Sequence, residues 1–221
     1  ASGETGSVKD KVSMAVKFNM IIAFPSAMGL SVLAEPVIRL LFPSSDYKTG
    51  GLMLITGSVC IIFYALSTVT NGVLQSIDKM GLPVIHSLIS LVVHIGIVAG
   101  LLLWTDMGVF ALVAGNVTYP VLVCILNGMS LKKYLGYEQE VTRTFCVPLI
   151  ASFIMGIVPF VIYYLLFILT HKIYVEILPA VAAAVFVYFI LVIKLQGLNR
   201  HELYEFPMGR RLSVVADKLH L

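Results

Sequence analysis

The polar side chains that could contact a ligand lie inside long apolar runs of this sequence. Asn71 and Gln75 stand four residues apart near the end of one run, so on a helix they share a face close to one membrane surface. Asn116 and Thr118 lie in another run, next to Tyr119. Polar groups at membrane depth are costly unless they face protein or water. These residues are therefore candidates to line a polar cavity, and an interhelical hydrogen bond is an equal alternative for Asn116 and Thr118.

Two histidines, His86 and His94, lie in a third apolar run, roughly on one side of a helix. A metal site would need further ligands, and no carboxylate is near them in sequence. We therefore expect histidines that face the bundle or the membrane interface. The cysteines form no CxxC or Cys/His cluster, so buried small hydrophobic residues are the favoured interpretation for Cys60, Cys124 and Cys146. The sequence predicts no bound metal and no cofactor.

Motifs of known catalytic sites are missing from this sequence. It has no glycine-rich phosphate loop, no HExxH and no GxSxG. No Asp or Glu lies deep in an apolar run, where an intramembrane aspartyl protease would need one and a proton-coupled transporter would normally want one. The basic residues are not clustered as in a nucleic-acid site. We therefore expect a membrane passage or scaffold rather than an enzyme, with no catalytic residue and no nucleic-acid partner.

The elements that hold the polar residues are six apolar runs. Hydrophobic residues make up 59% of the chain and charged residues 12%, whereas soluble domains carry about 25% charged residues. Roughly 20 apolar residues suffice to cross ~30 Å of hydrocarbon. Hydropathy places the runs at 13–34, 50–77, 82–104, 108–131, 145–169 and 173–193. The predicted fold is an all-α, polytopic membrane bundle of six transmembrane helices.

The distribution of basic residues predicts an orientation for these spans. Six spans place both termini on the same side of the membrane, and all but three of the 15 Lys and Arg residues fall on that side. The exceptions are Arg39, Lys48 and Lys172. Because basic residues are retained in the cytoplasm during insertion, we expect both termini to be cytoplasmic. The polar start without an initiator Met leads us to expect a piece of a longer protein.

Two prolines interrupt the predicted spans. Pro25 removes the amide bond to the carbonyl of Ile21, and Pro120 frees the carbonyl of Asn116. Each proline predicts a kink, and both are hinge candidates. For Pro25 a fixed kink is favoured over a moving hinge.

Two segments are predicted to form helices at the membrane surface. The segment PVIRLLF, after Glu35, is typical of a short interfacial helix with Arg39 reaching to water. The tail, residues 199–221, has an apolar stripe beside basic residues, which predicts an amphipathic helix on the anionic inner leaflet. A disordered tail is the alternative.

Three stretches together resemble one family. AFPSAMGLSVLAEPVIRLLFP resembles the span and outer helix of polysaccharide flippases, TNGVLQSIDKMGLPV resembles their LQ signature, and NRHELYEFPMGRRL resembles their ending. These proteins belong to the multidrug/oligosaccharidyl-lipid/polysaccharide exporter (MATE-like) superfamily, and stage V sporulation protein B and lipid II flippases are the members that look most similar. The resemblance covers nearly the whole chain.

The resemblance implies an architecture of two six-helix lobes around a V-shaped cavity, with two added C-terminal helices in some members. Residues 1–131 would then be four helices of the second lobe, 132–198 the two added spans and 199–221 a cytoplasmic tail. The N-terminal lobe would be missing from this chain. That lobe would supply the cavity charges.

The implied function is a flippase of the bacterial cytoplasmic membrane. It would move an undecaprenyl-linked oligosaccharide or a lipid II-like precursor by alternating access, in polysaccharide or peptidoglycan biosynthesis. Apolar grooves would hold the lipid tail, and Asn71, Gln75, Asn116 and Tyr119 would bind sugar hydroxyls. Its partners would be the lipid-linked sugar, membrane lipids and the missing lobe. The alternatives are a cation-coupled multidrug exporter, which would want an acid in the spans, and a non-transport scaffold of a cell-wall synthesis complex.

Overall fold

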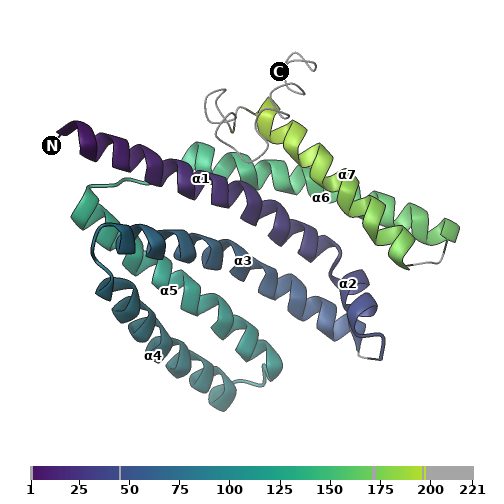
Figure 1. The fold of residues 1–221 in the computed structure, drawn as a ribbon. Helices are drawn as coiled ribbons and strands as arrows, with labels where there is room; N and C mark the ends of the chain where they lie inside the picture. The colour runs from purple at the N-terminus through teal and green to yellow at the C-terminus, as the bar shows by residue number, and fades with distance from the viewer. Residues whose placement is uncertain (1, 45, 171–172, 196, 198–221) are drawn as a thin grey trace. The chain divides into compact units, whose positions relative to one another are not determined.

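The computed structural model describes residues 2–44, 46–170, 173–195 and 197, and every regular element within them is helical (Figure 1). The helices are α1 (Ser2–Val32), α2 (Ala34–Leu41), α3 (Tyr47–Ser76), α4 (Gly81–Trp104), α5 (Val109–Leu135), a π-helical turn (Thr142–Cys146), α6 (Val147–Thr170) and α7 (Ile173–Lys194). The predicted all-α class is confirmed. The tail at 199–221, for which we predicted an amphipathic helix, lies outside the described residues.

Within the described residues, six helices are long and apolar enough to cross a membrane, which confirms the predicted number of spans. Their bounds are Val8–Val32, Tyr47–Ser76, Gly81–Trp104, Val109–Leu135, Thr142–Leu169 and Ile173–Lys194. The first span begins earlier than hydropathy alone indicated. The short helix expected after the first span is present as α2, which Leu33 separates from α1. The Arg39 guanidinium lies 5.9 Å from the centre of the Tyr47 ring, a cation–π distance.

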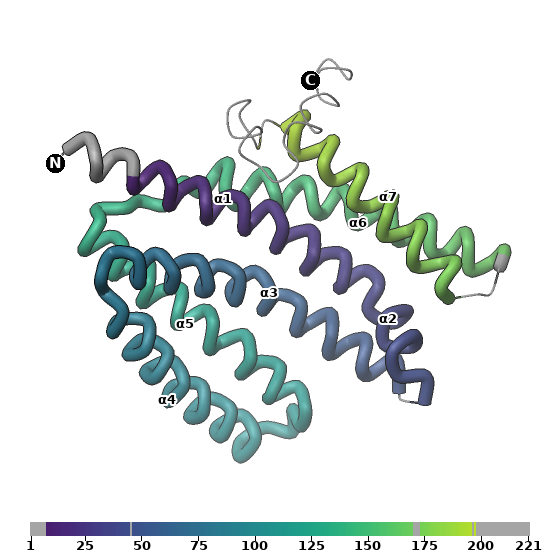
Figure 2. The backbone as a smooth tube through the Cα atoms, in the orientation of Figure 1, coloured from purple at the N-terminus to yellow at the C-terminus, as the bar shows by residue number. Residues whose placement is uncertain are grey.

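The described helices group into two compact units (Figure 2). Unit 1 comprises residues 1–19 and 52–139, so it holds the start of α1, most of α3, and all of α4 and α5. Unit 2 comprises residues 20–51 and 140–221, so it holds the rest of α1 together with α2, α6 and α7. The division that we expect at residue 131 stays a prediction.

In unit 1, α4 packs against α5 at a point that requires a glycine. A Cβ added at Gly115 would come within 2.1 Å of Val98 Cγ2 and 3.0 Å of His94 Cε1. No real side chain fits at such a distance, so the two backbones approach closely because Gly115 has none. α5 also contacts α3, where Cys124 Sγ donates to the carbonyl of Phe63 over 3.2 Å. The opposite face of α4 exposes large apolar side chains, as a lipid-facing surface does.

In unit 2, α6 packs along α7 through small buried residues. Ala151 and Ala180 are fully buried, and small side chains at such positions let membrane helices approach closely. α1 meets α6 at Gly156, where an added Cβ would lie 2.7 Å from Met28 Cε. The Phe24 and Phe145 rings add an edge-to-face contact with centroids 6.3 Å apart.

The start of α3 is capped by Asp46, which lies outside the spans. One carboxylate oxygen accepts the backbone N–H groups of Lys48 at 3.1 Å and Thr49 at 3.4 Å, and the other accepts the Thr49 hydroxyl at 2.6 Å. This is the geometry of an N-cap. The hydrogen bond from the Thr49 hydroxyl, followed by those from the two backbone groups, lowers the pKa of Asp46 below its ordinary value.

Candidate functional site

A row of three polar residues on α4 faces α5 inside unit 1. His86, Ser90 and His94 are four residues apart, so they lie one above the other on one helix face. His86 and Ser90 are buried, and His94 is half-buried. We call these three residues the polar stripe. It is unusual because the rest of α4 is almost wholly apolar.

At the His86 end of the polar stripe, the buried side-chain amide of Asn127 joins three helices. The amide group of Asn127 donates to Thr70 Oγ1 at 2.9 Å and to Asn71 Oδ1 at 2.8 Å, which uses both of its N–H groups. Its carbonyl oxygen lies 2.8 Å from His86 Nδ1, so His86 must donate there. His86 Nε2 lies 3.4 Å from the hydroxyl of Ser130. α3, α4 and α5 are therefore tied together by fully paired polar groups.

At the other end of the polar stripe, His94 contacts the backbone of α5. His94 Nδ1 lies 2.8 Å from the carbonyl oxygen of Gly115, which also accepts the Thr118 hydroxyl at 2.7 Å. The His94 ring meets the Tyr119 ring edge to face, with centroids 6.2 Å apart. The Tyr119 ring in turn lies 6.3 Å from that of Tyr64 on α3. These groups form a polar and aromatic cluster in the middle of α4.

The four residues predicted to line a cavity differ in their surroundings. Asn71 is half-buried and accepts a hydrogen bond from Asn127, while Gln75, one turn further along, is exposed. Asn116 is exposed, and Tyr119 is half-buried against His94. The structure thus places Asn71 and Tyr119 at opposite ends of the polar stripe. That these four residues line a substrate cavity stays a prediction.

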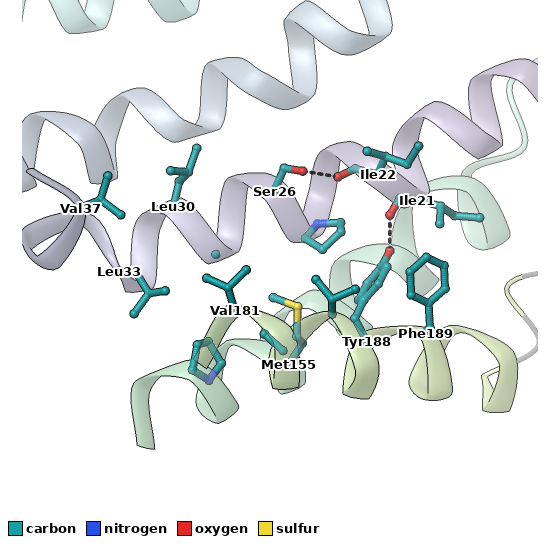
Figure 3. A pocket seen from close by; sticks show the side chains of 15 residues that line it. Ile21, Ile22, Ser26, Leu30, Leu33, Val37, Met155, Val181, Tyr188 and Phe189 are labelled. Carbon is teal, nitrogen blue, oxygen red and sulfur yellow. Dashed lines mark hydrogen bonds between the residues drawn. The ribbon is translucent and has the colours of Figure 1, made fainter. Parts of the chain in front are cut away.

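Unit 2 contains an apolar groove between α1, α2, α6 and α7, with a volume of about 520 Å³ (Figure 3). Most of its lining residues are aliphatic or aromatic. None of the lining residues is charged, and two of them, Ser26 and Tyr188, carry a hydroxyl group. Pro25 and Gly29 of α1 face Met155 of α6 and Val181 of α7 across it. The groove is suited to hold a hydrocarbon chain.

The groove borders the carbonyl that Pro25 leaves without an intrahelical donor. Tyr188 of α7 donates its hydroxyl to the carbonyl of Ile21 over 2.7 Å, as Figure 3 shows. Both residues are almost completely buried. The neighbouring Ser26 hydroxyl donates to the carbonyl of Ile22 over 2.7 Å. The backbone defect at Pro25 is therefore repaired by a side chain of another helix, as membrane helices with internal proline require.

Sequence reasoning missed several buried polar residues. Lys17 is 2% exposed, although its sequence position suggested the edge of the first span. Asn127 is fully buried, and in sequence it lies in the same apolar run as Asn116 and Thr118. Glu176, in the first turn of α7, is 2% exposed, and its Oε1 has no hydrogen-bond partner. A polar residue inside an apolar run was itself the available signal, because such residues are costly in lipid.

The six apolar helices of the described residues, with buried hydrogen bonds between neighbouring helices inside each unit, define a polytopic α-helical membrane protein. The family model described as "Lipid II flippase MurJ" matches residues 1–184, so the chain belongs to the MurJ lipid II flippase family.

Curated relatives agree with this assignment. The chain is 28% identical over 121 residues to the probable lipid II flippase MurJ of Bdellovibrio bacteriovorus (52% of this chain, 23% of that protein). It is 24% identical over 201 residues to the lipid II flippase MurJ of Bacillus subtilis (85% and 36%), and 23% identical over 210 residues to stage V sporulation protein B of the same organism (94% and 39%). The chain therefore spans less than two fifths of each of these relatives. No solved structure matches it.

Proposed function

We propose that this chain is the C-terminal part of a flippase that moves an undecaprenyl-linked oligosaccharide, of the lipid II type, across the bacterial cytoplasmic membrane. The membership of the MurJ family supports the class of substrate. The apolar groove of unit 2 carries the proposal, because a long isoprenoid tail needs an apolar surface inside the protein while its head group moves.

The groove suits a section of isoprenoid chain for three reasons. Its lining is apolar, so a hydrocarbon chain loses no hydrogen bond on entering. Pro25 and Gly29 leave room along α1, because neither carries a long side chain. Its volume of about 520 Å³ falls within the range of small-molecule sites, ~300–1,000 Å³. The groove holds part of the tail, and the surrounding lipid holds the rest.

Unit 1 would contact the sugar. Asn71, Gln75, Asn116 and Tyr119 supply amide and hydroxyl groups, which are the partners that sugar hydroxyls require. The only carboxylate inside the described spans of this unit is Asp10, near the start of the first span, and these spans also hold one buried cation, Lys17. The remaining charges for the substrate diphosphate would come from an N-terminal lobe, which the partial coverage of the relatives supports.

The same proposal includes the arrangement of the chain in the membrane. Residues 1–131 form four helices of the second lobe, residues 132–198 add two spans, and both ends of the chain face the cytoplasm. The lobes exchange access between the two sides of the membrane. Pro25 and Pro120 are the proposed hinges, and bending at Pro25 requires the Tyr188 bond to the Ile21 carbonyl to lengthen or break.

The test is a flipping assay on the protein expressed from its complete gene and reconstituted into liposomes with fluorescent lipid II. Val181→Trp places an indole in the groove, and we expect flipping to fall about tenfold or more, as loss of substrate binding energy does. Val92→Trp on α4 is the matched control, because Val92 is 65% exposed and does not line the groove.

Three results separate the proposals. Absence of lipid II flipping by the wild-type protein refutes the flippase function. Efflux of an organic cation dye without lipid II flipping favours the drug exporter, and neither activity favours a scaffold. Equal flipping by the two tryptophan variants would refute the role of the groove and leave the function in place.

A further inference from the structure

Two polar atoms of the polar stripe lack a hydrogen-bond partner. Ser90 is completely buried, and its hydroxyl oxygen has none. One turn further along α4, about 6 Å in rise, His94 uses Nδ1 for the Gly115 carbonyl and has no hydrogen-bond partner at Nε2 among the described residues. An unpaired buried hydroxyl costs about 1–3 kcal/mol, so its presence in a membrane helix calls for a functional reason.

The hydrogen bond at Nδ1 determines which ring nitrogen of His94 carries the hydrogen. A backbone carbonyl only accepts hydrogen bonds, so Nδ1 must carry the hydrogen. In the neutral imidazole Nε2 is then the basic atom, with a free lone pair. His86 differs, because Ser130 and Asn127 occupy its two nitrogens. His94 is the histidine of the polar stripe that is open to a proton.

The helices around His94, which are α3, α4 and α5, contain no Asp or Glu that could face a positive charge on its ring. The titratable groups that face it are Tyr119 on α5 and, behind that ring, Tyr64 and Cys60 on α3, none of which is a carboxylate. α1, which is tied to α3 by the bond from Asn19 to the Ala65 carbonyl, contributes the buried cation Lys17. Asp10 lies near the start of the first span, and Asp78, Asp106 and Glu138 lie in loops. The three helices around His94 therefore supply no anion to balance a charge on its ring.

We propose that His94 is a proton-binding residue, and that it takes up one proton at Nε2 together with the anionic diphosphate of the substrate. The proton passes from hydronium to the Nε2 lone pair, leaves a water molecule, and returns to water when the substrate departs. Ser90 supplies a second polar group to the water that delivers it. This inference rests on the proposed function, because the diphosphate is the anion that balances the new charge.

The experiment measures flipping of fluorescent lipid II by the protein from its complete gene, in liposomes held at pH 6 or pH 8 on both sides. We expect the wild-type rate to be on the order of tenfold higher at pH 6 than at pH 8, because the proposed cycle takes up a proton with the substrate. A pH-sensitive dye trapped in the liposomes should report a proton displacement when lipid II is added.

Two matched variants separate the charge from the structure. His94→Asn keeps an N–H group where Nδ1 donates to Gly115 and removes Nε2, so flipping should become independent of pH and the dye signal should vanish. His86→Asn makes the same change on the same helix, keeps the donor to Asn127, and should retain the pH response. The thermal stability of both variants is measured alongside.

The outcomes for the proton and for the flippase are distinct. Wild-type flipping at equal rates at the two pH values, without a dye signal, overturns the proton-binding role of His94 and leaves the flippase function standing. A His94→Asn variant that keeps the pH response overturns it as well. Absence of flipping at either pH overturns the proposed function and, with it, this inference.

Discussion

Tyr188 repairs the backbone defect that Pro25 creates, and replacing it with phenylalanine tests this directly. Tyr188→Phe removes one oxygen and leaves the Ile21 carbonyl, on a residue that is 1% exposed, without its donor. A buried acceptor that loses its partner costs about 1–3 kcal/mol. We expect the free energy of unfolding, measured by SDS titration in mixed micelles, to fall by about this amount. Tyr164→Phe is the control, because Tyr164 is 50% exposed and its hydroxyl makes no hydrogen bond to the described residues.

A second substitution, at Pro25, tests whether the proline is the reason that the Ile21 carbonyl depends on Tyr188. Pro25→Ala returns an N–H group that can donate to the Ile21 carbonyl within α1. On this background Tyr188→Phe removes a second donor rather than the sole one, so its cost should fall to about 0.5–1 kcal/mol. The difference between the two costs is the coupling energy of a double-mutant cycle. Equal costs on the two backgrounds, or a cost no greater than that of Tyr164→Phe, would refute the reasoning.

Three further predictions concern packing, capping and topology. Gly115→Ala should lower stability by about 1–3 kcal/mol, because its Cβ would come 2.1 Å from a valine methyl group of α4, whereas Gly128→Ala meets no atom within 4 Å and should not. Asp46→Ala should lower the melting temperature at pH 7. Because the pKa of Asp46 is lowered in the folded state, the stabilisation by this cap is present above the unfolded pKa of about 3.9 and is lost as pH falls through the folded value. The variant should therefore lose less stability than wild type between pH 5 and pH 2. Cysteines placed at Lys48 and Lys133, in a cysteine-free background, should react with an impermeant thiol reagent from opposite sides of the membrane, and labelling from the same side would overturn the six-span orientation.

Much of the fold could be predicted because transmembrane helices carry strong local signals. A window of about 20 apolar residues is sufficient to identify a span, and the six spans follow from hydropathy alone. The helix α2 was also predictable, because Pro36 breaks the pattern and Arg39 needs water. The grouping of helices into two units was not, because apolar faces look alike in sequence whether they meet lipid or another helix.

The candidate site was predictable only as a set of residue types. The histidines and the amide Asn71 stood out against apolar neighbours, but their partners lie far away in sequence. Asn127 is 41 residues from His86 and 56 from Asn71, so no local pattern indicated that it joins them. The prolines were better signals, because the carbonyl that each proline leaves unpaired is the one four residues before it in the sequence. The identity of the donor, Tyr188 for Ile21, required the fold.

In each unit one side chain reaches a backbone carbonyl of a neighbouring helix. In unit 2 the Tyr188 hydroxyl donates to the Ile21 carbonyl of α1, which Pro25 leaves without an intrahelical donor. In unit 1 the His94 ring reaches the Gly115 carbonyl of α5, at the glycine where the two helices approach closely. Breaking one such bond costs only about 0.5–1.5 kcal/mol when water or another donor replaces it. In the alternating-access cycle that we propose, bending of α1 at Pro25 would therefore cost only a few times the thermal energy at this bond.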